Sequence, residues 1–422
     1  MKRPVDLSAA KPRVKVLLTT ALAKLRELGH TEVNLFVDTT NVPAILLYDS
    51  YGFVPVLEDE KVGVISGSRV ISEWLEEVID NPLFMPKNPE ERIEVRRIVD
   101  WFEDKFSREV KSVNKDFLKH GDVLVKVEYS GLNYKDALIL KNGAKLVKEF
   151  PHIPGIDFSG TVVESKNENY KEGDEIICTG WRVGELYYGG YSQYAKVKGE
   201  FLVKRPKNLS AKQSMILGTA GLTAIQCAFA VKAREELLLQ KKVVDVIVTG
   251  ASGGVGSMAV MILNKLGINV TAVSGKKENH DYLKSLGAKN LINTADLDKD
   301  ARPLDKGLYD GAVDTVGGNI LANVLSHIRD KGIVAACGNA NHYKLNTTVM
   351  PFIIRGVKLW GINSVDTSKK RRDFLWGELP NLIDFSLLEK SVKEISLDEL
   401  LNTYSQMLEG KTSGRYLINL SK

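Results

Sequence analysis

One stretch limits the fold of this chain more than any other: VDVIVTGASGGVG, residues 244–256, an apolar run that leads directly into four glycines. Its three consecutive β-branched residues, Val246, Ile247 and Val248, are typical of a strand buried on both faces of a parallel sheet. The apolar positions of SMAVMILNKLG, residues 257–267, predict a helix directly after the glycines. Glycines between such a strand and a helix let backbone N–H groups approach a pyrophosphate at the helix N-terminus. We therefore predict a dinucleotide site here, rather than an ordinary strand-to-helix turn.

The length of the chain, 422 residues, exceeds what one ordinary hydrophobic core contains and predicts two or three domains. A hydrophobic content of 44% and a charged content of 26% are typical of a soluble globular protein. The formal net charge of +5 is spread along the chain, so we expect neither nucleic-acid nor membrane binding. No stretch approaches the roughly 20 apolar residues that a membrane-spanning helix needs.

The chain has three cysteines, Cys178, Cys227 and Cys337, which are far apart and form no C-x-x-C motif. This spacing excludes a disulfide framework and a four-cysteine zinc lobe, and it indicates a reducing compartment. The basic and apolar start of the chain superficially resembles a secretory signal, but Thr19 and Thr20 interrupt its apolar core. We therefore expect a cytoplasmic protein.

The amino-terminal part of the chain contains two partial resemblances. Residues 1–60, with the predicted strand EVNLFVD, resemble the carboxyl-terminal part of an N-acetyltransferase of the GNAT superfamily. The pyrophosphate-binding turn of that family should lie near residues 13–18, RVKVLL, which have no glycine, so we do not expect acetyl transfer. Residues 61–115 resemble a fragment of a glutathione transferase, with Ser68 at the γ-glutamyl contact but Gly67 in place of its acidic neighbour. We interpret both pieces as a mostly helical appendage of mosaic origin.

Residues 116–216 combine short apolar segments with Gly and Pro turns, which beside a dinucleotide fold indicates a β-rich domain. Apolar and polar residues alternate through Val123, Val125 and Val127, as in a half-buried antiparallel strand. A polar cluster, NYKD at residues 133–136, follows this strand and contains the first candidates for chemistry.

Motifs spread over residues 114–422 identify a family when they are taken in order. NYKDAL, FPHIPGIDFSGTV, GTAGLTA, VTGASGGVGS, DTVG and TTVMPFI together resemble the zinc-independent quinone-oxidoreductase branch of the medium-chain dehydrogenase/reductases, and within it the acryloyl-CoA reductase group. The resemblance implies an α/β fold in which a Rossmann doubly wound parallel sheet, residues 217–341, is inserted in a β-rich GroES-like substrate domain. The two parts of that domain would be residues 116–216 and 342–422. Where zinc-dependent relatives place a metal-binding cysteine, this chain has Asn133, so we expect no metal.

The resemblance implies NADPH-dependent reduction of the carbon–carbon double bond of an α,β-unsaturated acyl-CoA, acryloyl-CoA to propanoyl-CoA, without a metal. This chemistry needs hydride at Cβ, a hydrogen bond to the carbonyl oxygen and a proton for Cα. Tyr134 is the candidate for the hydrogen bond or the proton, and a ring that only covers the nicotinamide is an equal alternative. Asn133 and Asp136 are further catalytic candidates, although hydrogen bonds that hold the loop are the stronger interpretation. Quinone reduction and a catalytically idle NADPH-binding module are the alternative functions.

The end of the second predicted strand distinguishes NADPH from NADH. NAD sites commonly place Asp or Glu about 20 residues beyond the glycines, to accept from the ribose 2′-hydroxyl. Here Ser274, Gly275 and Lys276 occupy that position, and a hydroxyl and an ammonium group suit a 2′-phosphate; solvated lysines at a helix start are the alternative. The resemblance adds further expected cofactor contacts: Tyr134, Thr219, Ser252, Gly253, Gly254, Val255, Asn339, Ile353, Ser364 and Arg415.

Several residues allow two interpretations. Trp181 either lines the acyl pocket or packs, and Arg415 either reaches a phosphate or lies on the surface. Residues 347–365, TTVMPFIIRGVKLWGINSV, predict a loop and two strands. Within them RGVKLWGI resembles the strand that forms dimers in this superfamily, so we expect a homodimer, with an ordinary edge strand as the alternative. Cys337 is interpreted as a small buried residue rather than a nucleophile.

Overall fold

The computed structural model describes residues 118, 121–140, 146–147, 152–237 and 242–420, together with three short strands nearer the amino terminus. The chain divides into two compact units, Met1–Val113 and Asn114–Lys422. In the first unit β1 (Val33–Phe36), β2 (Val56–Asp59) and β3 (Gly63–Ser66) form an antiparallel sheet in that order. β1 confirms the strand predicted in EVNLFVD. The rest of the acetyltransferase-like and glutathione-transferase-like stretches lies outside the described residues.

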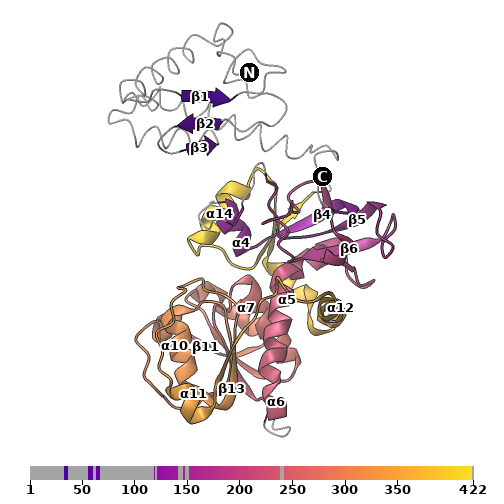
Figure 1. Ribbon diagram of the computed structural model, residues 1–422. Helices are drawn as coiled ribbons and strands as arrows, with labels where there is room; N and C mark the ends of the chain where they lie inside the picture. Colours follow the sequence, from indigo (N-terminus) through magenta and orange to yellow (C-terminus); the bar gives the residue numbers. More distant parts are fainter. Residues whose placement is uncertain are drawn as a thin grey trace. The chain divides into compact units, whose positions relative to one another are not determined.

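The second unit contains a seven-stranded sheet and a six-stranded sheet (Figure 1). The larger sheet has the order β15-β16-β4-β5-β6-β8, and β7 pairs with β4. Its pairs are antiparallel except for β15 with β16, as expected for the β-rich domain. Its strands are β4 (Val123–Leu132), β5 (Asp157–Ser165), β6 (Glu175–Thr179), β7 (Tyr194–Val197), β8 (Leu202–Lys204), β15 (Val392–Ile395) and β16 (Arg415–Asn419).

β4 is the central strand of this sheet. It pairs with β5 along one edge and with β7 and then β16 along the other. Val123, Val125 and Val127 are completely buried, which confirms the alternating pattern on that face. Leu124 on the opposite face is also buried, so the start of the strand is covered on both sides rather than half-buried as predicted.

The smaller sheet is parallel and has the order β11-β10-β9-β12-β13-β14. Val246 and Val248 of β9 belong to the core that contains α5 and α7, whereas Ile247 belongs to the core on the other face, with α10. The β-branched run is therefore confirmed as a strand buried on both faces, in a doubly wound α/β sheet. Its strands are β9 (Asp245–Val248), β10 (Asn269–Val273), β11 (Ala288–Ile292), β12 (Tyr309–Asp314), β13 (Ile328–Ala336) and β14 (Lys358–Gly361).

Helices lie on both sides of the parallel strands, with α5 on one side and α10 on the other (Figure 1). The helices of this unit are α4 (Tyr134–Leu140), α5 (Ala211–Lys232), α6 (Arg234–Leu237), α7 (Gly254–Lys265), α8 (His280–Ser285), α9 (Thr294–Leu297), α10 (Gly318–Ser326), α11 (Met350–Arg355), α12 (Lys369–Glu378), α13 (Phe385–Leu388) and α14 (Leu400–Leu408). Short 3₁₀ turns occur at Gly199–Phe201, Lys277–Asn279, Leu379–Leu382 and Glu389–Ser391.

The prediction of two strands between residues 347 and 365 is wrong, because the first of them is a helix. Met350–Arg355 forms α11, with Pro351 in its first turn, and Gly356 ends it in the left-handed region at φ +60°. The second strand is β14, the edge strand of the parallel sheet. The parallel sheet thus continues beyond residue 341, where we expected the Rossmann part to end, and the antiparallel sheet resumes at β15.

α5 corrects the expectation that the chain has no stretch long and apolar enough to cross a membrane. It has 22 residues and a mean hydropathy of 1.6 in its most apolar window. However, 83% of that window is buried inside the protein, against α7 and against strands of both sheets. A single apolar helix of this kind is weak evidence for a membrane, and its burial is that of a core helix.

Gly256 allows α7 to approach the turn before it. A Cβ atom at Gly256 would lie 2.3 Å from the carbonyl oxygen of Gly250 and 2.7 Å from the Cα atom of Ala251, so the helix and the turn would have to separate. We predict that Gly256→Ala lowers the free energy of unfolding by about 1–3 kcal/mol, as overpacking does. Urea denaturation measures the change. The control is Gly377→Ala in α12, where nothing lies within 4 Å of an added Cβ atom. It should be neutral or stabilise by up to about 1 kcal/mol, and equal effects of the two substitutions would contradict the prediction.

Candidate active site

The glycine turn, residues 250–256, follows β9 and extends into the first turn of α7. Gly250 has φ +57°, in the left-handed region that favours glycine, and a Cβ atom there would lie 2.2 Å from Oγ1 of Thr315. Gly253 precedes the first residue of α7 and is exposed. Backbone N–H groups at the start of a helix have no partner within the helix, and the helix dipole favours an anion there. The turn therefore has a backbone conformation suited to a pyrophosphate.

Ser252, Ser274 and Lys276 lie together beside the glycine turn. Oγ of Ser274 donates to Oγ of Ser252 at 3.3 Å and accepts from the backbone N–H of Lys276 at 3.2 Å. The Lys276 ammonium group donates to the carbonyl oxygen of Thr412 at 2.6 Å, and burial lowers the pKa of this lysine. The backbone N–H of Gly414 donates to the carbonyl oxygen of Ser252 at 3.3 Å. The segment before β16 thus contacts the ends of both β9 and β10.

A buried polar network surrounds the amide group of Asn133 and joins β5, β16, α4 and α5. Oδ1 of Asn133 accepts from the Arg415 guanidinium at 3.0 Å, and its Nδ2 donates to Asp157 at 3.0 Å and to Asp136 at 3.2 Å. Arg415 also donates to two carbonyl oxygens of α5, at 2.9 and 3.0 Å. Arg415 is only 5% exposed, so the alternative of a surface arginine is wrong, and its contact with a phosphate stays a prediction. Burial lowers the pKa of Arg415, and the charge of Asp157 opposes that shift.

A kink in α5 places Thr219 beside the glycine turn. Gly218 has φ +49°, and a Cβ atom there would lie 2.6 Å from Oδ2 of Asp157, the oxygen that accepts the Thr219 backbone N–H at 2.7 Å. The next residue, Ala220, has its Cβ atom 3.5 Å from the place where a Cβ of Gly254 would be. The hydroxyl group of Thr219 is buried and has no hydrogen-bond partner in the part of the chain that the structure describes. A bound polar group would satisfy this hydroxyl.

Tyr134 is the exposed member of the predicted catalytic trio. It is the first residue of α4, so the polar cluster forms a helix, and its side chain is 39% exposed. Asp136 is completely buried and accepts from the backbone N–H groups of Asn133 at 3.0 Å and Ile156 at 2.9 Å. Asn133 and Asp136 therefore hold the start of α4, and Tyr134 is the one of the three that is exposed.

The loop after β6 has an unusual backbone. Trp181 and Arg182 have φ of +56° and +58°, and two successive non-glycine residues in this region cost about 1–3 kcal/mol each. The Trp181 ring stacks on Phe201 with centroids 5.4 Å apart, and the guanidinium carbon of Arg372 lies 5.0 Å from its centroid. Arg182 pairs with the buried carboxylate of Glu185 at 3.6 Å. These contacts favour the interpretation of Trp181 as a packed side chain that shapes the loop.

Arg372 ties this loop to the segment after β14. It is completely buried, and none of the ion pairs among the described residues includes it. Its guanidinium donates to the carbonyl and hydroxyl oxygens of Thr179, at 2.6 and 3.0 Å, and to the carbonyl oxygens of Ser364, Val365 and Thr367, each at 3.1 Å. Burial lowers the pKa of Arg372 to about 10, so it remains charged at neutral pH.

Two family models match the second unit. The alcohol dehydrogenase GroES-like domain matches residues 119–207, and the zinc-binding dehydrogenase model matches residues 254–385. The chain is 44% identical over 312 residues to the Probable acrylyl-CoA reductase AcuI of Escherichia coli (strain K12), a match that covers 74% of this chain and 95% of that protein. The chain belongs to the medium-chain dehydrogenase/reductase family.

Two other members of the family are similarly close. The Putative quinone oxidoreductase YhfP of Bacillus subtilis (strain 168) is 43% identical over 319 residues, which cover 75% of this chain and 96% of that protein. The crystal structure of the YhdH oxidoreductase from Salmonella enterica in complex with NADP matches with a TM-score of 0.69 and 44% identity, over 73% of this chain and 94% of that one. The predicted resemblance, and the Rossmann sheet within a GroES-like domain, are confirmed.

One of the two family models is named for zinc-binding dehydrogenases, but the side chains of this chain do not fit a zinc ion. Within the described residues no three His, Cys, Asp or Glu side chains are grouped as a metal site. Asn133, which the sequence resemblance places where zinc-dependent relatives have a cysteine, is hydrogen-bonded to Arg415 and to two aspartates. Burial raises the pKa of the Cys178 thiol to about 12, which disfavours the thiolate that zinc would need. The expectation of a metal-free reaction itself stays a prediction.

The other predicted cofactor residues differ in their positions. Ser364 accepts a hydrogen bond from Thr223 at 2.9 Å, one turn of α5 beyond Thr219. Asn339 and Gly275 are exposed on the loops that follow β13 and β10, at the carboxyl edge of the sheet. Val255 packs against the core beneath α7. These predicted cofactor residues thus lie near the carboxyl ends of the parallel strands.

Ile353 is not among them. It lies on α11 and is 67% exposed. The last residue of α11, Arg355, donates to the carbonyl oxygen of Ile328, which begins β13, so this helix reaches the opposite edge of the sheet. Its neighbours Ile354 and Val349 are exposed as well, at 61% and 65%. Ile353 therefore lies on a helix whose end contacts the start of β13, and its approach to the cofactor stays a prediction.

Sequence reasoning missed three residues that shape the site: Asp157, Glu185 and Arg372. Asp157 starts a strand inside the otherwise apolar motif HIPGIDFSG, and a carboxylate at such a position could have indicated a buried hydrogen-bonding role. Glu185 and Arg372 stand in polar segments with no comparable signal. Their importance follows from burial, at 4% and 0% exposed, which depends on contacts between distant segments.

Asp136 makes the stability of the protein depend on pH. Burial, followed by the charge of Asp157, raises the pKa of Asp136 to about 7, against the opposing effect of its hydrogen bonds. Because the native pKa lies above the unfolded value, the stabilising contribution of this group is complete below about pH 4 and is lost as the pH rises to about 7. We predict that the free energy of unfolding falls between about pH 4 and pH 7 as this contribution is lost.

The measurement is urea denaturation at several pH values, with Asp136→Asn and, as the control, Asp300→Asn, which changes an exposed aspartate. Asp136→Asn lowers stability overall, because an amide group would face backbone donors, but it should flatten the pH profile. A profile with the same slope in wild type and Asp136→Asn would contradict the assignment.

Proposed function

We propose that this chain is an NADPH-dependent reductase of the carbon–carbon double bond of a short α,β-unsaturated acyl-CoA, of the type acryloyl-CoA to propanoyl-CoA. The observation that carries this proposal is the 44% identity to the Probable acrylyl-CoA reductase AcuI, which extends over 95% of that protein. The glycine turn, the kinked α5 and the exposed Tyr134 supply the groups that such a reaction needs.

The residues around the glycine turn fit NADPH. The start of α7 would hold the pyrophosphate, and Ser274 with Lys276 would hold the 2′-phosphate once the lysine leaves the carbonyl oxygen of Thr412. The end of β10 has no acidic residue to accept from a 2′-hydroxyl group, which favours NADPH over NADH. The unpartnered hydroxyl of Thr219 would bond the carboxamide. When bound, NADPH supplies the hydride.

Tyr134 is the group of this chain best placed to act on the substrate. Its phenol can donate a hydrogen bond to the thioester carbonyl oxygen, where negative charge develops, or a proton to Cα. Asn133 and Asp136 act as positioning residues, because their hydrogen bonds hold the first turn of α4. Asp157 positions Thr219 through the backbone N–H of that residue.

The second candidate function is quinone reduction, which is favoured by the 43% identity to the Putative quinone oxidoreductase YhfP.

We place the reaction in the cytoplasm, since the three cysteines of the chain are unpaired and two of them are buried.

The purified full chain should oxidise NADPH on addition of acryloyl-CoA, and more slowly with NADH in place of NADPH or with a benzoquinone in place of the thioester. The absorbance of the reduced nicotinamide follows the rate, and mass spectrometry identifies propanoyl-CoA. Faster turnover of the quinone would support the second candidate. NADPH binding without turnover of either substrate would indicate the idle module instead.

Tyr134→Phe tests the role of the phenol in the same assay. Loss of a general acid or a transition-state hydrogen bond should lower kcat by about 100-fold or more, with little change in the KM for NADPH. Tyr343→Phe, at a tyrosine that is 75% exposed, is the matched control. Unchanged turnover of Tyr134→Phe would leave only the role of a ring that covers the nicotinamide.

We also infer that the protein forms a homodimer through β14. This strand is the edge of the parallel sheet, and all four of its residues are exposed, with Trp360 at 49% and Leu359 at 38%. An unpaired edge that carries exposed apolar side chains is a surface on which a second copy can add its own strand. The sequence resemblance of RGVKLWGI to the dimer strand of the superfamily points to the same surface.

Trp360→Lys should convert the dimer to a monomer in analytical ultracentrifugation, because a charged side chain at an apolar interface loses its hydration. Phe374→Lys is the control: Phe374 is also 49% exposed but lies on α12. A wild-type protein that sediments as a monomer, or equal effects of both substitutions, would contradict the proposed interface.

A further inference from the structure

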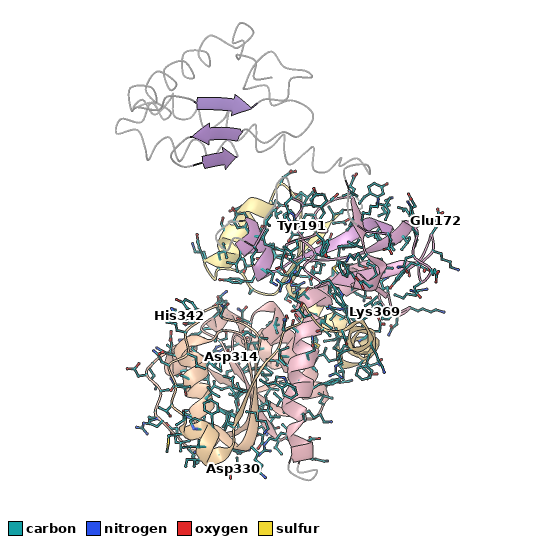
Figure 2. All side chains as sticks on the ribbon, viewed as in Figure 1. Glu172, Tyr191, Asp314, Asp330, His342 and Lys369 are labelled. Atoms are coloured by element: carbon teal, nitrogen blue, oxygen red, sulfur yellow. The ribbon has the colours of Figure 1, made fainter. Side chains whose placement is uncertain are left out.

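A pocket lies at the amino-terminal edge of the parallel sheet, remote from the glycine turn. It has a volume of about 390 Å³, and its walls include Arg234, Lys242, Arg329 and Arg355. Arg329 is the second residue of β13, a strand whose other end reaches the carboxyl edge. Figure 2 shows the adjoining Asp330 at the end of this sheet farther from the antiparallel sheet than Asp314. The pocket is therefore separate from the proposed cofactor site.

Arg234 is the buried group of this pocket, with a side chain only 3% exposed. Nη2 donates to the carbonyl oxygen of Asp330 at 3.0 Å. Nη1 lies 3.2 Å from Oδ1 of Asp310 as an ion pair, without hydrogen-bond alignment. Nε is buried and has no hydrogen-bond partner within the described part of the chain. A buried donor without an acceptor is costly, so an anion in the pocket would gain by supplying one.

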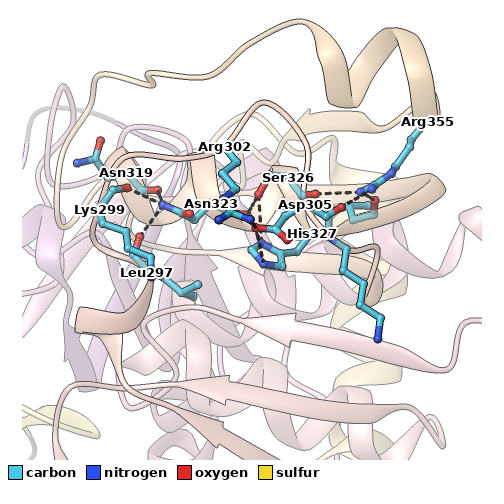
Figure 3. Close-up of polar contacts among 11 residues, drawn as sticks. Leu297, Lys299, Arg302, Asp305, Asn319, Asn323, Ser326, His327 and Arg355 are labelled. Carbon is cyan, nitrogen blue, oxygen red and sulfur yellow. Dashed lines mark hydrogen bonds and ion pairs between the residues drawn. The ribbon is translucent and has the colours of Figure 1, made fainter.

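Two further cations have no carboxylate partner in the ion pairs of the described residues. Arg355 donates to the backbone carbonyl oxygens of Ser326 and Ile328, both at 2.9 Å, and to that of Asp305 (Figure 3). These acceptors are neutral and orient the guanidinium, and its charge acts on the nearby carboxylate of Asp305, whose pKa is lowered by a backbone hydrogen bond and by several cations that include Arg355. Lys242 is exposed at the rim.

The nearby carboxylates are largely engaged by the protein. Asp310 accepts from the backbone N–H groups of Val244 at 2.8 Å and Asp245 at 3.1 Å, and it pairs with Arg234 and Arg329, each at 3.2 Å. Asp245 pairs with Arg329 at 3.0 Å. Asp310 and Asp245 thus share Arg329, while Asp330 in the pocket wall and Asp305 beside Arg355 form no ion pair with these four cations.

We infer that this pocket binds a small oxyanion of the phosphate type, at a site additional to the active site. Guanidinium and ammonium groups that converge from several elements match the tetrahedral arrangement of phosphate oxygens, and arginine can donate to two of them at once. A water molecule occupies about 30 Å³ in the liquid, so a pocket of about 390 Å³ has the volume of more than ten water molecules. This is more space than one phosphate ion needs. The ligand can therefore be free phosphate or a phosphate group on a small molecule.

Isothermal titration calorimetry of inorganic phosphate and of pyrophosphate tests the site, with the full chain saturated with NADP⁺ and chloride used to hold the ionic strength constant. Saturable binding to one site is expected. Lys242→Gln should weaken it about tenfold, as the loss of one charge near a partly exposed anion does, and Asp330→Asn should strengthen it. The control is Lys299→Gln, at an exposed lysine outside the pocket, which should leave it unchanged.

Absence of saturable binding would overturn the proposal, and so would equal weakening by Lys242→Gln and Lys299→Gln, because that is the behaviour of a diffuse ionic atmosphere. Phosphate binding that disappears on saturation with NADP⁺ would assign the anion to the glycine turn instead. A chain that fails to bind NADP⁺ would count against the proposed function alone, and the response of phosphate binding to Lys242→Gln would then still decide whether the pocket is the site.

Discussion

The amide group of Asn133 connects three buried charges, and the geometry of the active site depends on that connection. Oδ1 accepts from Arg415, which is 282 positions away in the chain, while Nδ2 donates to Asp136 and Asp157. An amide can bridge a cation and two carboxylates because it carries an acceptor at one end and donors at the other. Removal of one partner from a buried charge pair typically costs about 3–5 kcal/mol, so the network holds its elements together only when it is complete.

The kink of α5 is a consequence of this network. Asp157 occupies the space that a side chain at residue 218 would need, and glycine at that position lets the helix depart from regular geometry. The same carboxylate then fixes the backbone of Thr219 next to the glycine turn. A carboxylate at the start of β5, in the antiparallel sheet, thus holds the backbone of Thr219 beside the glycine turn of the parallel sheet.

Local sequence signals predicted those parts of the protein whose structure depends on neighbouring residues. The strand, the glycines and the helix from residue 244 to 267 were predicted correctly, because backbone freedom at glycine and β-branched packing are local properties. The short apolar run MPFIIR was misassigned, since a run of that length fits a strand or a helix equally well and Pro351 at the first turn favours the helix. The exposed position of Ile353 likewise depends on that helix.

The amino-acid sequence by itself determined the family, the order of the two sheets along the chain, the glycine turn and the absence of an acidic residue after the second strand. Tertiary structure alone decided that Arg415 is buried, that Asp157 and Arg372 are buried and hydrogen-bonded to distant segments, and that four cations line one pocket at the far edge of the parallel sheet. The physical reason is that desolvation and charge compensation depend on which segments meet in space. The desolvation of a charged side chain and the presence of its partners cannot be predicted from the residues next to it in the sequence.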